Sequence, residues 1–256
     1  MNVILGILFH SLGGGASGSW YMPYNWVQKW RWEIYWITGG IFSWLIMPFL
    51  AVILTIPDWQ GILHASSGAV IRNTYIMGLL WGLGGLTYGL AIRYLGMSLG
   101  NSVLLGITSV VGSLGLPVLR NVPGIAEIIP SGLAFTDLLG STGGLIVLLG
   151  IAILLAGIIL SGRAGIKKDQ DLGHIKEGVN SEFKLSKGLI IAVISGVLSA
   201  FFSFGIDAGK EMGTIARSLA VEQSYPFLSE ESGSIKYLFE NNIIFFVILW
   251  GGLTTN

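Results

Sequence analysis

The sequence predicts an all-α protein, a polytopic bundle of membrane-spanning helices. Seven stretches of about 20 apolar residues run through the 256-residue chain, and that length suits a helix that crosses the hydrocarbon core of a bilayer. Apolar residues make up 52% of the chain and charged residues only 11%, whereas a soluble domain usually carries about 25% charged residues. The 38 glycines lie inside the apolar stretches, where small residues allow helices to pack closely in lipid.

The spans can be placed in order along the chain. We expect them at residues 3–22, 35–56, 74–93, 97–119, 142–162, 188–208 and from 243 onward. The first is too long, and lacks the basic leader, to be a cleaved signal peptide, so we expect a retained helix. Only Tyr94, Leu95 and Gly96 join the third and fourth spans, which predicts a tight antiparallel hairpin.

The last span is short. The residues from Ile243 to Asn256 cover about 21 Å as a helix, and a hydrocarbon core is about 30 Å thick. We therefore expect the chain to end within its seventh span. The longest polar segments, 163–187 and 209–242, predict solvent loops.

The basic residues predict an orientation. The loops after the first, third and fifth spans hold nine Lys and Arg residues, and the opposite side holds five. Because basic residues accumulate on the cytoplasmic side, this count predicts an outside N-terminus and a cytoplasmic 163–187 loop.

A faint internal repeat also runs through the chain. A shift of 182 residues pairs Gly6 with Gly188, Gly14 with Gly196, Ser17 with Ser199, and Asn25 with Asp207. Identities between glycine-rich helices also arise by chance, but an offset of five spans makes the two repeats antiparallel, as in many transporters. We therefore divide the chain into a first five-span repeat (1–162), a cytoplasmic loop (163–187) and an incomplete second repeat (188–256).

Several function classes are disfavoured. The chain has no cysteine, which excludes disulfides, thiolate metal sites and thiol catalysis. It contains no GxSxG, HExxH or P-loop motif, and its three histidines are dispersed, so we predict no enzyme, no metal site and no cofactor. The net charge is zero, so nothing indicates a nucleic-acid partner.

Polar and aromatic residues form strips on the spans, because residues three or four apart are neighbours on a helix. Aromatic rings suit the C–H faces of a neutral sugar, and hydroxyl and amide groups suit its hydroxyls. The candidate substrate-binding residues are Ser17, Tyr21, Trp36, Trp81, Tyr88, Asn101 and Thr108. Asn101 is the best single candidate, since an amide in lipid is costly without partners. An adjacent strip on the fourth span holds Ser102, Gly106, Ser109 and Ser113. The alternative is that these strips are packing seams, and that aromatic residues near span ends form an interfacial belt.

Three ionisable residues in or beside the spans are candidates for proton coupling. His10 ranks first, because histidine titrates near neutral pH and this one lies within the first span. Glu33 lies between two tryptophans, and Asp207 lies near the end of the sixth span. The alternatives are that His10 packs against a neighbouring helix, that Glu33 pairs with Lys29, and that Asp207 pairs with Lys210.

The chain resembles the L-rhamnose–proton symporter family of the drug/metabolite transporter superfamily. The resemblance lies in the run from His10 to Pro23, in Trp30-Arg31-Trp32-Glu33, in Gly39-Gly40 and Ser43-Trp44, in the run from Arg93 to Gly100, and in Gly106-Ile107-Thr108. It covers essentially the whole chain and is densest over residues 6–117.

This resemblance implies ten spans in two inverted five-span halves, proton-driven sugar uptake and a bacterial inner-membrane location. The partners that it implies are a small sugar, protons and the lipid bilayer. The chain departs from the family pattern by ending at Trp250–Asn256, three spans short.

The leading hypothesis is therefore a secondary transporter that imports L-rhamnose or a similar 6-deoxy sugar with protons. One alternative is a metabolite exporter of the same superfamily. Another is a seven-helix membrane sensor, although the seventh span has no lysine for a retinal Schiff base.

Overall fold

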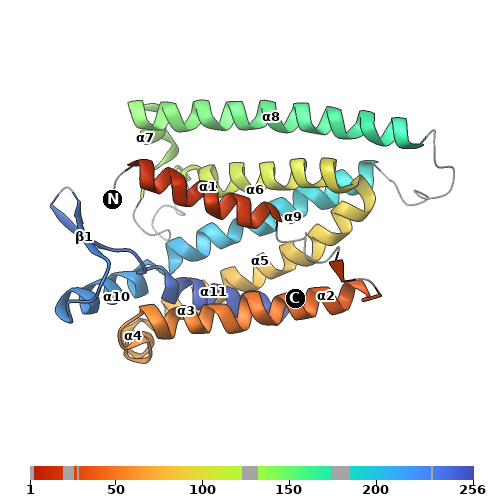
Figure 1. The fold of residues 1–256 in the computed structure, drawn as a ribbon. Coiled ribbons are helices and arrows are strands. Elements are labelled where there is room, and N and C mark those ends of the chain that lie inside the picture. Colours follow the sequence, from red (N-terminus) through yellow and green to blue (C-terminus); the bar gives the residue numbers. More distant parts are fainter. Residues whose placement is uncertain (1–2, 20–25, 28, 123–131, 174–184, 232) are drawn as a thin grey trace. The chain divides into compact units, whose positions relative to one another are not determined.

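The structure, a computed structural model, describes residues 3–19, 26–27, 29–122, 132–173, 185–231 and 233–256 (Figure 1). These residues form helices almost throughout, with one short hairpin. The elements are α1 (Val3–Ser19), α2 (Trp32–Gly40), the π-helix η2 (Ile41–Ile46), α3 (Met47–Thr55), α4 (Trp59–Ala65), α5 (Gly68–Leu95), α6 (Met97–Arg120), α7 (Phe135–Leu139), α8 (Thr142–Gly173), α9 (Leu185–Ala208), α10 (Lys210–Glu222), β1 (Leu228–Glu231), β2 (Ser234–Tyr237) and α11 (Asn242–Thr255).

Five helical segments are long and apolar enough to cross a membrane. They are Ile34–Thr55, Gly68–Leu95, Leu99–Arg120, Thr142–Ala164 and Ser186–Ala208, and they coincide with the second to sixth predicted spans. The first and seventh predicted spans contain the shorter apolar helices Ile4–Ala16 and Asn242–Thr255. The chain is thus a helical integral membrane protein, and the count of seven spans and the inverted repeat stay predictions.

The span Ile34–Thr55 is built from α2, η2 and α3 in succession. The π-helix η2 in the middle of this span precedes Pro48, which lies at the start of α3. Proline lacks a backbone N–H and its ring collides with the carbonyl one turn earlier. A π-turn there relieves the collision and lets the helix continue across the membrane.

Contacts divide the chain into two compact units. Unit 1 comprises residues 1–66 and 211–246, and unit 2 comprises residues 67–210 and 247–256. These units do not test the two repeats predicted on either side of the 163–187 segment, because a division by contacts reports compactness and not internal symmetry. The repeats stay a prediction. Helix α8 continues to Gly173, so the first part of the predicted 163–187 loop is helical, and residues 174–184 lie outside the described part.

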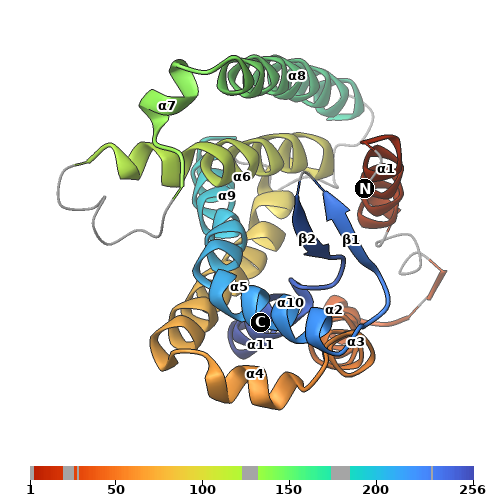
Figure 2. The same ribbon diagram turned by 90° about the vertical axis from the view of Figure 1, so that its left-hand side faces the viewer.

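Unit 2 is a helical bundle in which α9 packs against both α5 and α6, and α8 packs on α6 (Figures 1 and 2). Glycines bring α5 unusually close to its neighbours. A Cβ atom on Gly78 would lie 2.1 Å from the backbone oxygen of Ile248 in α11, and one on Gly84 would lie 2.9 Å from the backbone nitrogen of Ser199 in α9. Small residues at these positions therefore set the helix separations.

In unit 1, the segment predicted as a solvent loop at 209–242 is folded, which corrects that expectation. Its α10 buries Met212, Ala216 and Ala220, spaced by four residues along one face. Strands β1 and β2 pair antiparallel, with Leu228 opposite Tyr237. The amphipathic spacing of α10 explains the order, since its apolar stripe needs a surface to cover it.

Tyr237 anchors this segment to the end of α3. Its hydroxyl donates a hydrogen bond to the backbone oxygen of Thr55, and Asn242 Nδ2 donates to Thr55 Oγ1 at 2.9 Å. The Tyr237 ring lies edge-on to Tyr225, with centroids 6.3 Å apart. Burial, and secondarily the charge that Tyr225 acquires, raise the pKa of Tyr237, so its hydroxyl remains a donor through the neutral range.

Candidate functional site

The predicted site residues divide between the two units. Unit 2 holds five of them, in the helices α5, α6 and α9. These are Trp81, Tyr88, Asn101, Thr108 and Asp207. Unit 1 holds His10, Ser17, Glu33 and Trp36, whereas Tyr21 lies outside the described residues. Among the described candidates, a hydrogen bond joins Tyr88 to Asn101.

Tyr88 and Asn101 form a polar pair across the α5–α6 hairpin. The tight turn at Gly96, with φ 77°, folds α6 back along α5. The Tyr88 hydroxyl donates a hydrogen bond to Asn101 Oδ1 at 2.6 Å, and both side chains are half-buried. Asn101 Nδ2 makes no hydrogen bond within the described part of the chain, so it can donate to a ligand. The sequence predicted both residues but not their contact.

Thr108 joins α6 to α9. Its hydroxyl lies 2.9 Å from the backbone oxygen of Leu104 and 3.1 Å from that of Gly196. A parallel contact joins α9 to α5, where the fully buried Ser195 donates to the backbone oxygen of Gly84 at 2.8 Å. The hydroxyl protons here serve helix packing, as the packing-seam alternative expects, and Ser195 was absent from the predicted strips.

Trp81 lies among α5, α9 and α11. Its ring is 5.3 Å from that of Phe202, and a Cβ atom on Gly252 would lie 2.5 Å from it. The side chain is half-buried. Its indole packs against the ring of Phe202 with the ring planes tilted by 59°.

A cavity of about 280 Å³ lies between α6 and α8. It is lined by Ser102, Leu105, Gly106, Ser109, Leu154, Gly157, Ile158 and Ser161. Three members of the predicted serine strip, Ser102, Gly106 and Ser109, face it, and Ser161 adds a hydroxyl from the other helix. The cavity therefore combines apolar walls with hydroxyl groups from two helices.

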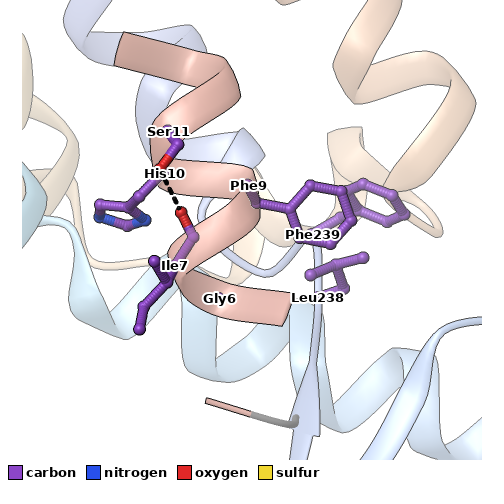
Figure 3. A pocket seen from close by; sticks show the side chains of 7 residues that line it. All are labelled: Gly6, Ile7, Phe9, His10, Ser11, Leu238 and Phe239. Atoms are coloured by element: carbon purple, nitrogen blue, oxygen red, sulfur yellow. Dashed lines mark hydrogen bonds between the residues drawn. The ribbon is translucent and has the colours of Figure 1, made fainter. Parts of the chain in front are cut away.

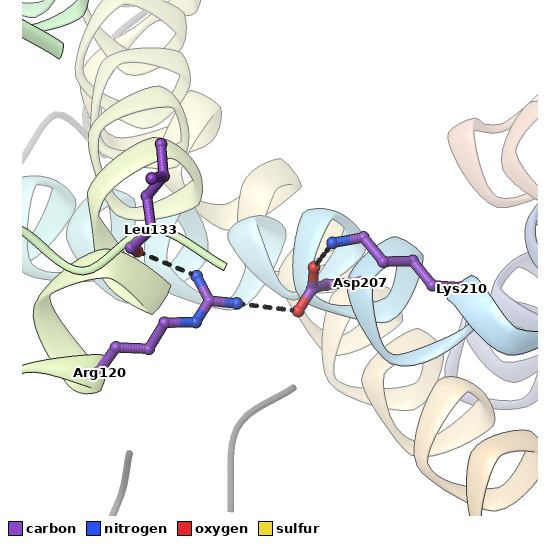
Figure 4. Close-up of polar contacts among 4 residues, drawn as sticks. All are labelled: Arg120, Leu133, Asp207 and Lys210. Atoms are coloured by element: carbon purple, nitrogen blue, oxygen red, sulfur yellow. Dashed lines mark hydrogen bonds and ion pairs between the residues drawn. The ribbon is translucent and has the colours of Figure 1, made fainter. Parts of the chain in front are cut away.

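Asp207, near the end of α9, forms ion pairs with two cations (Figure 4). Arg120 Nη2 lies 3.2 Å from Asp207 Oδ2, and the Lys210 ammonium contacts Oδ1. Arg120 Nη1 also donates to the backbone oxygen of Leu133 at 3.4 Å. The pairing with Lys210 is the alternative that the sequence offered for Asp207. Arg120 was missed, and its signal was a lone charge at the end of the fourth span.

His10 lies on an exposed face of α1 and lines an open groove of about 830 Å³ in unit 1 (Figure 3). The other lining residues are Gly6, Ile7, Phe9, Ser11, Leu238 and Phe239. The Ser11 hydroxyl donates back to the oxygen of Ile7 at 2.9 Å, so the groove is largely apolar.

Trp36 is buried, with its ring 5.6 Å from that of Trp44 in a T-shaped arrangement. Ser17 and Glu33 lie on α1 and α2, and their side chains are outside the described part of the structure. Within the described residues, no three His, Asp or Glu side chains gather as metal ligands would.

Comparison with known proteins identifies the family. The model of the family described as "L-rhamnose-proton symport protein (RhaT)" matches residues 1–233. The chain is 38% identical, over 223 residues, to L-rhamnose-proton symporters of Cronobacter sakazakii (strain ATCC BAA-894), Yersinia pestis bv. Antiqua (strain Antiqua) and Yersinia pseudotuberculosis serotype O:3 (strain YPIII). These alignments cover 87% of this chain and 60% of each relative, so the chain spans about 60% of their length. No solved structure matches. The chain belongs to the L-rhamnose–proton symport protein family.

Proposed function

We propose that the protein is a secondary transporter that imports L-rhamnose or a similar 6-deoxy sugar together with protons across the bacterial inner membrane. The observation that carries this proposal is the identity of 38% to L-rhamnose-proton symporters over 87% of the chain. Transport, and not an enzymatic reaction, is the proposed activity. It is proposed for the whole protein, because the chain spans about 60% of those relatives.

We further propose that seven spans of a ten-span protein lie in this chain, as two inverted repeats. Residues 1–162 form the first repeat and residues 188–256 belong to the second. The five long apolar helices and the two shorter ones support the count. Rocking of the two repeats about a central site would give alternating access.

Within unit 2, the sugar contacts are proposed at the Tyr88–Asn101 pair, Trp81 and Thr108. Ser17, Tyr21 and Trp36 stay candidates that rest on the sequence. The support is chemical, because Asn101 Nδ2 is available as a donor and the half-buried indole of Trp81 offers an apolar ring. We expect Asn101→Ala and Trp81→Ala each to weaken sugar binding by about 1–3 kcal/mol, the cost of a lost buried contact.

Sugar binding to the detergent-purified full-length protein checks this expectation. Ser218→Ala is the matched control, since its exposed hydroxyl donates within α10, to the oxygen of Thr214. If both site variants bind sugar as the parent does, these faces are packing seams.

Proton coupling is proposed for one of His10, Glu33 and Asp207. The variants His10→Gln, Glu33→Gln and Asp207→Asn separate them. Replacement of the coupling residue should abolish proton-driven accumulation and preserve sugar exchange. Accumulation that stays pH-dependent in all three variants would place the proton site elsewhere.

Uptake of labelled L-rhamnose by the full-length protein tests the proposed function itself. Vesicles that contain the protein should accumulate the sugar along an inward proton gradient, and a protonophore should abolish accumulation. Empty vesicles are the control, and competition by a panel of sugars defines the substrate. No uptake, with efflux of another solute, would favour the exporter.

A further inference from the structure

We propose that the cavity between α6 and α8 is a groove that binds a phospholipid of the cytoplasmic leaflet, by its ester group and one acyl chain. The inference goes beyond the proposed transport, because it requires only that the two helices span the membrane and does not depend on the solute carried. It concerns unit 2 alone, to which both helices belong.

Helices α6 and α8 lie side by side and run antiparallel along this groove (Figures 1 and 2). A Cβ atom on Gly162 of α8 would lie 3.2 Å from Leu99 Cδ1 of α6. Further along, a Cβ atom on Gly106 of α6 would lie 1.9 Å from Ile158 Cδ1 of α8. The beginning of the apolar stretch of α6 therefore lies beside the end of the apolar stretch of α8.

One end of the groove lies at the edge of the hydrocarbon core. The apolar spans are Leu99–Arg120 and Thr142–Ala164, and the groove residues Ser102 and Ser161 each lie three residues inside the matching end of their span. Three residues of helix correspond to about 4–5 Å. The two hydroxyl groups are thus near the depth at which phospholipid ester groups separate the acyl chains from the headgroups.

The other end of the groove lies at the middle of the membrane. Ser109 of α6 and Leu154 of α8 line it, each ten residues inside the same ends of their spans. Ten residues of helix cover about 15 Å, which is half of a hydrocarbon core of about 30 Å. The groove therefore extends through the acyl region of a single leaflet.

The polarity of the groove changes along its length as the polarity of a phospholipid does. Near the edge of the core, the hydroxyl of Ser161 is exposed and makes no hydrogen bond within the described part of the chain. A hydroxyl in apolar surroundings is costly without a partner, and an ester carbonyl supplies the acceptor that it needs. Deeper in the membrane, the Ser109 hydroxyl donates to the backbone oxygen of Leu105 at 2.8 Å, so that end offers mainly apolar contact.

The groove is open along one side. Leu105 and Leu154 are 59% and 37% exposed, and since they lie within membrane spans, lipid is what an exposed side chain there meets. Gly106 and Gly157 leave the space between the helices, and a Cβ atom on Gly157 would meet no described atom within 4 Å. An acyl chain matches both the apolar walls and the open side.

The orientation and the sugar contacts define the site further. The count of basic residues predicts a cytoplasmic 163–187 segment, which follows the end of the groove that holds Ser161. That end therefore belongs to the cytoplasmic leaflet. The proposed sugar contacts Asn101 and Thr108 are not among the residues that line the groove, so the lipid site and the sugar site are separate.

Native mass spectrometry of the detergent-purified full-length protein tests the groove. The probes are dioleoyl phosphatidylglycerol and dioleoyl phosphatidylethanolamine, titrated separately. Gly157→Leu fills the groove and should weaken the tightest lipid binding at least tenfold for both probes, because they share the ester and acyl parts that the groove contacts. Gly143→Leu is the matched control, since it makes the same change in open space at the opposite end of the span, and it should bind both lipids as the parent does.

The hydroxyl of Ser161 is tested in the same measurement. Ser161→Ala should weaken lipid binding by up to about tenfold, the effect of one lost hydrogen bond. Ser161→Thr keeps a hydroxyl group and should retain the affinity of the parent. This pair decides the question if Gly157→Leu fails to fold, as judged by gel filtration.

Several outcomes would overturn the proposal. One is a folded Gly157→Leu protein that binds both lipids as the parent does. Another is the loss of phosphatidylglycerol binding alone, which would mean that headgroup charge is recognised. A parent that binds neither lipid would show that another part of the full-length chain fills the groove, and displacement of the lipid by L-rhamnose would make the groove a sugar site. Because no transport is measured, these outcomes stand apart from any failure to carry L-rhamnose.

Discussion

Helices α5 and α8 are both long apolar helices with several glycines, yet those glycines have different surroundings. In α5, Gly78 and Gly84 lie against the backbones of α11 and α9. In α8, an added Cβ at Gly143, Gly150 or Gly157 would meet no described atom within 4 Å, and the close backbone contact of Gly144, 2.1 Å from the oxygen of Leu138, is with the adjoining α7. The buried share of the most apolar stretch is 22% in α5 and 6% in α8.

The partner helices explain this difference. The helices that face α5 also carry small residues at the contact, among them Gly251 and Gly252 in α11 and Ser195 in α9. When both facing helix surfaces carry small side chains, the backbones can approach closely, which gives dispersion contacts and interhelical hydrogen bonds. Helix α8 instead inserts a side chain, that of Ile158, over Gly106 of α6. A glycine in one span therefore permits close packing, and the partner's residues decide whether it occurs.

The largest effect should come from Gly78→Ala in α5. The new Cβ would lie 2.1 Å from the backbone oxygen of Ile248, so α11 must move away as a whole. We expect a destabilisation at or above the usual 1–3 kcal/mol of overpacking, because a backbone atom cannot rotate aside. Thermal unfolding in detergent, followed by circular dichroism, measures it.

The matched control is Gly150→Ala in α8, where the added methyl group meets open space. It should be neutral or slightly stabilising, since alanine favours a helix over glycine. Equal losses of stability in the two variants would show that the close approach of α5 and α11 contributes nothing special.

A smaller effect is expected from Ser195→Ala, which removes the buried hydrogen bond to the oxygen of Gly84. Such bonds between membrane helices contribute about 0.6 kcal/mol on average, and less than about 2 kcal/mol at most. Ser161→Ala on α8 is the control, because its hydroxyl is exposed. The same unfolding measurement compares them, and a cost at Ser161 equal to that at Ser195 would contradict the role of the α5–α9 contact.

Length and composition were enough to predict five of the spans, because crossing a bilayer imposes a length and an apolar surface on each helix. The short link at residues 94–96 predicted the α5–α6 hairpin, and the strips on both helices included Tyr88 and Asn101. Their hydrogen bond was not predictable, since the periodicity of one helix says nothing about its rotation against another.

Two features escaped prediction for identifiable reasons. Arg120 and Asp207 are 87 residues apart, and only the packing of α6 on α9 brings them together. Helix α10 was taken for solvent loop because its overall polarity hid the spacing of Met212, Ala216 and Ala220. The four-residue spacing of these apolar residues can be seen in the sequence. It indicates an amphipathic helix even in a segment whose mean hydropathy is low.

Another small effect, and the sharpest test of the comparison, should come from Gly106→Ala in α6. The new Cβ would lie 1.9 Å from Ile158 Cδ1, a shorter distance than the one at Gly78. Ile158 Cγ1 would also lie close, at 2.6 Å. Yet both are side-chain atoms and not backbone, and Ile158 borders the cavity of about 280 Å³ between α6 and α8. Rotation of the side chain into that cavity should keep the cost near or below about 1 kcal/mol, the energy of a modest rotamer strain.

A double-mutant cycle with Ile158→Ala isolates this contact. In that background the branches of Ile158 are gone, so Gly106→Ala should cost nothing further. If Gly106→Ala alone destabilises the protein as much as Gly78→Ala, distance and not the mobility of the contacted atom sets the cost. The contrast between the α5–α11 contact, made by backbone atoms, and the α6–α8 contact at Gly106, made by a side chain, would then not correspond to a difference in stability.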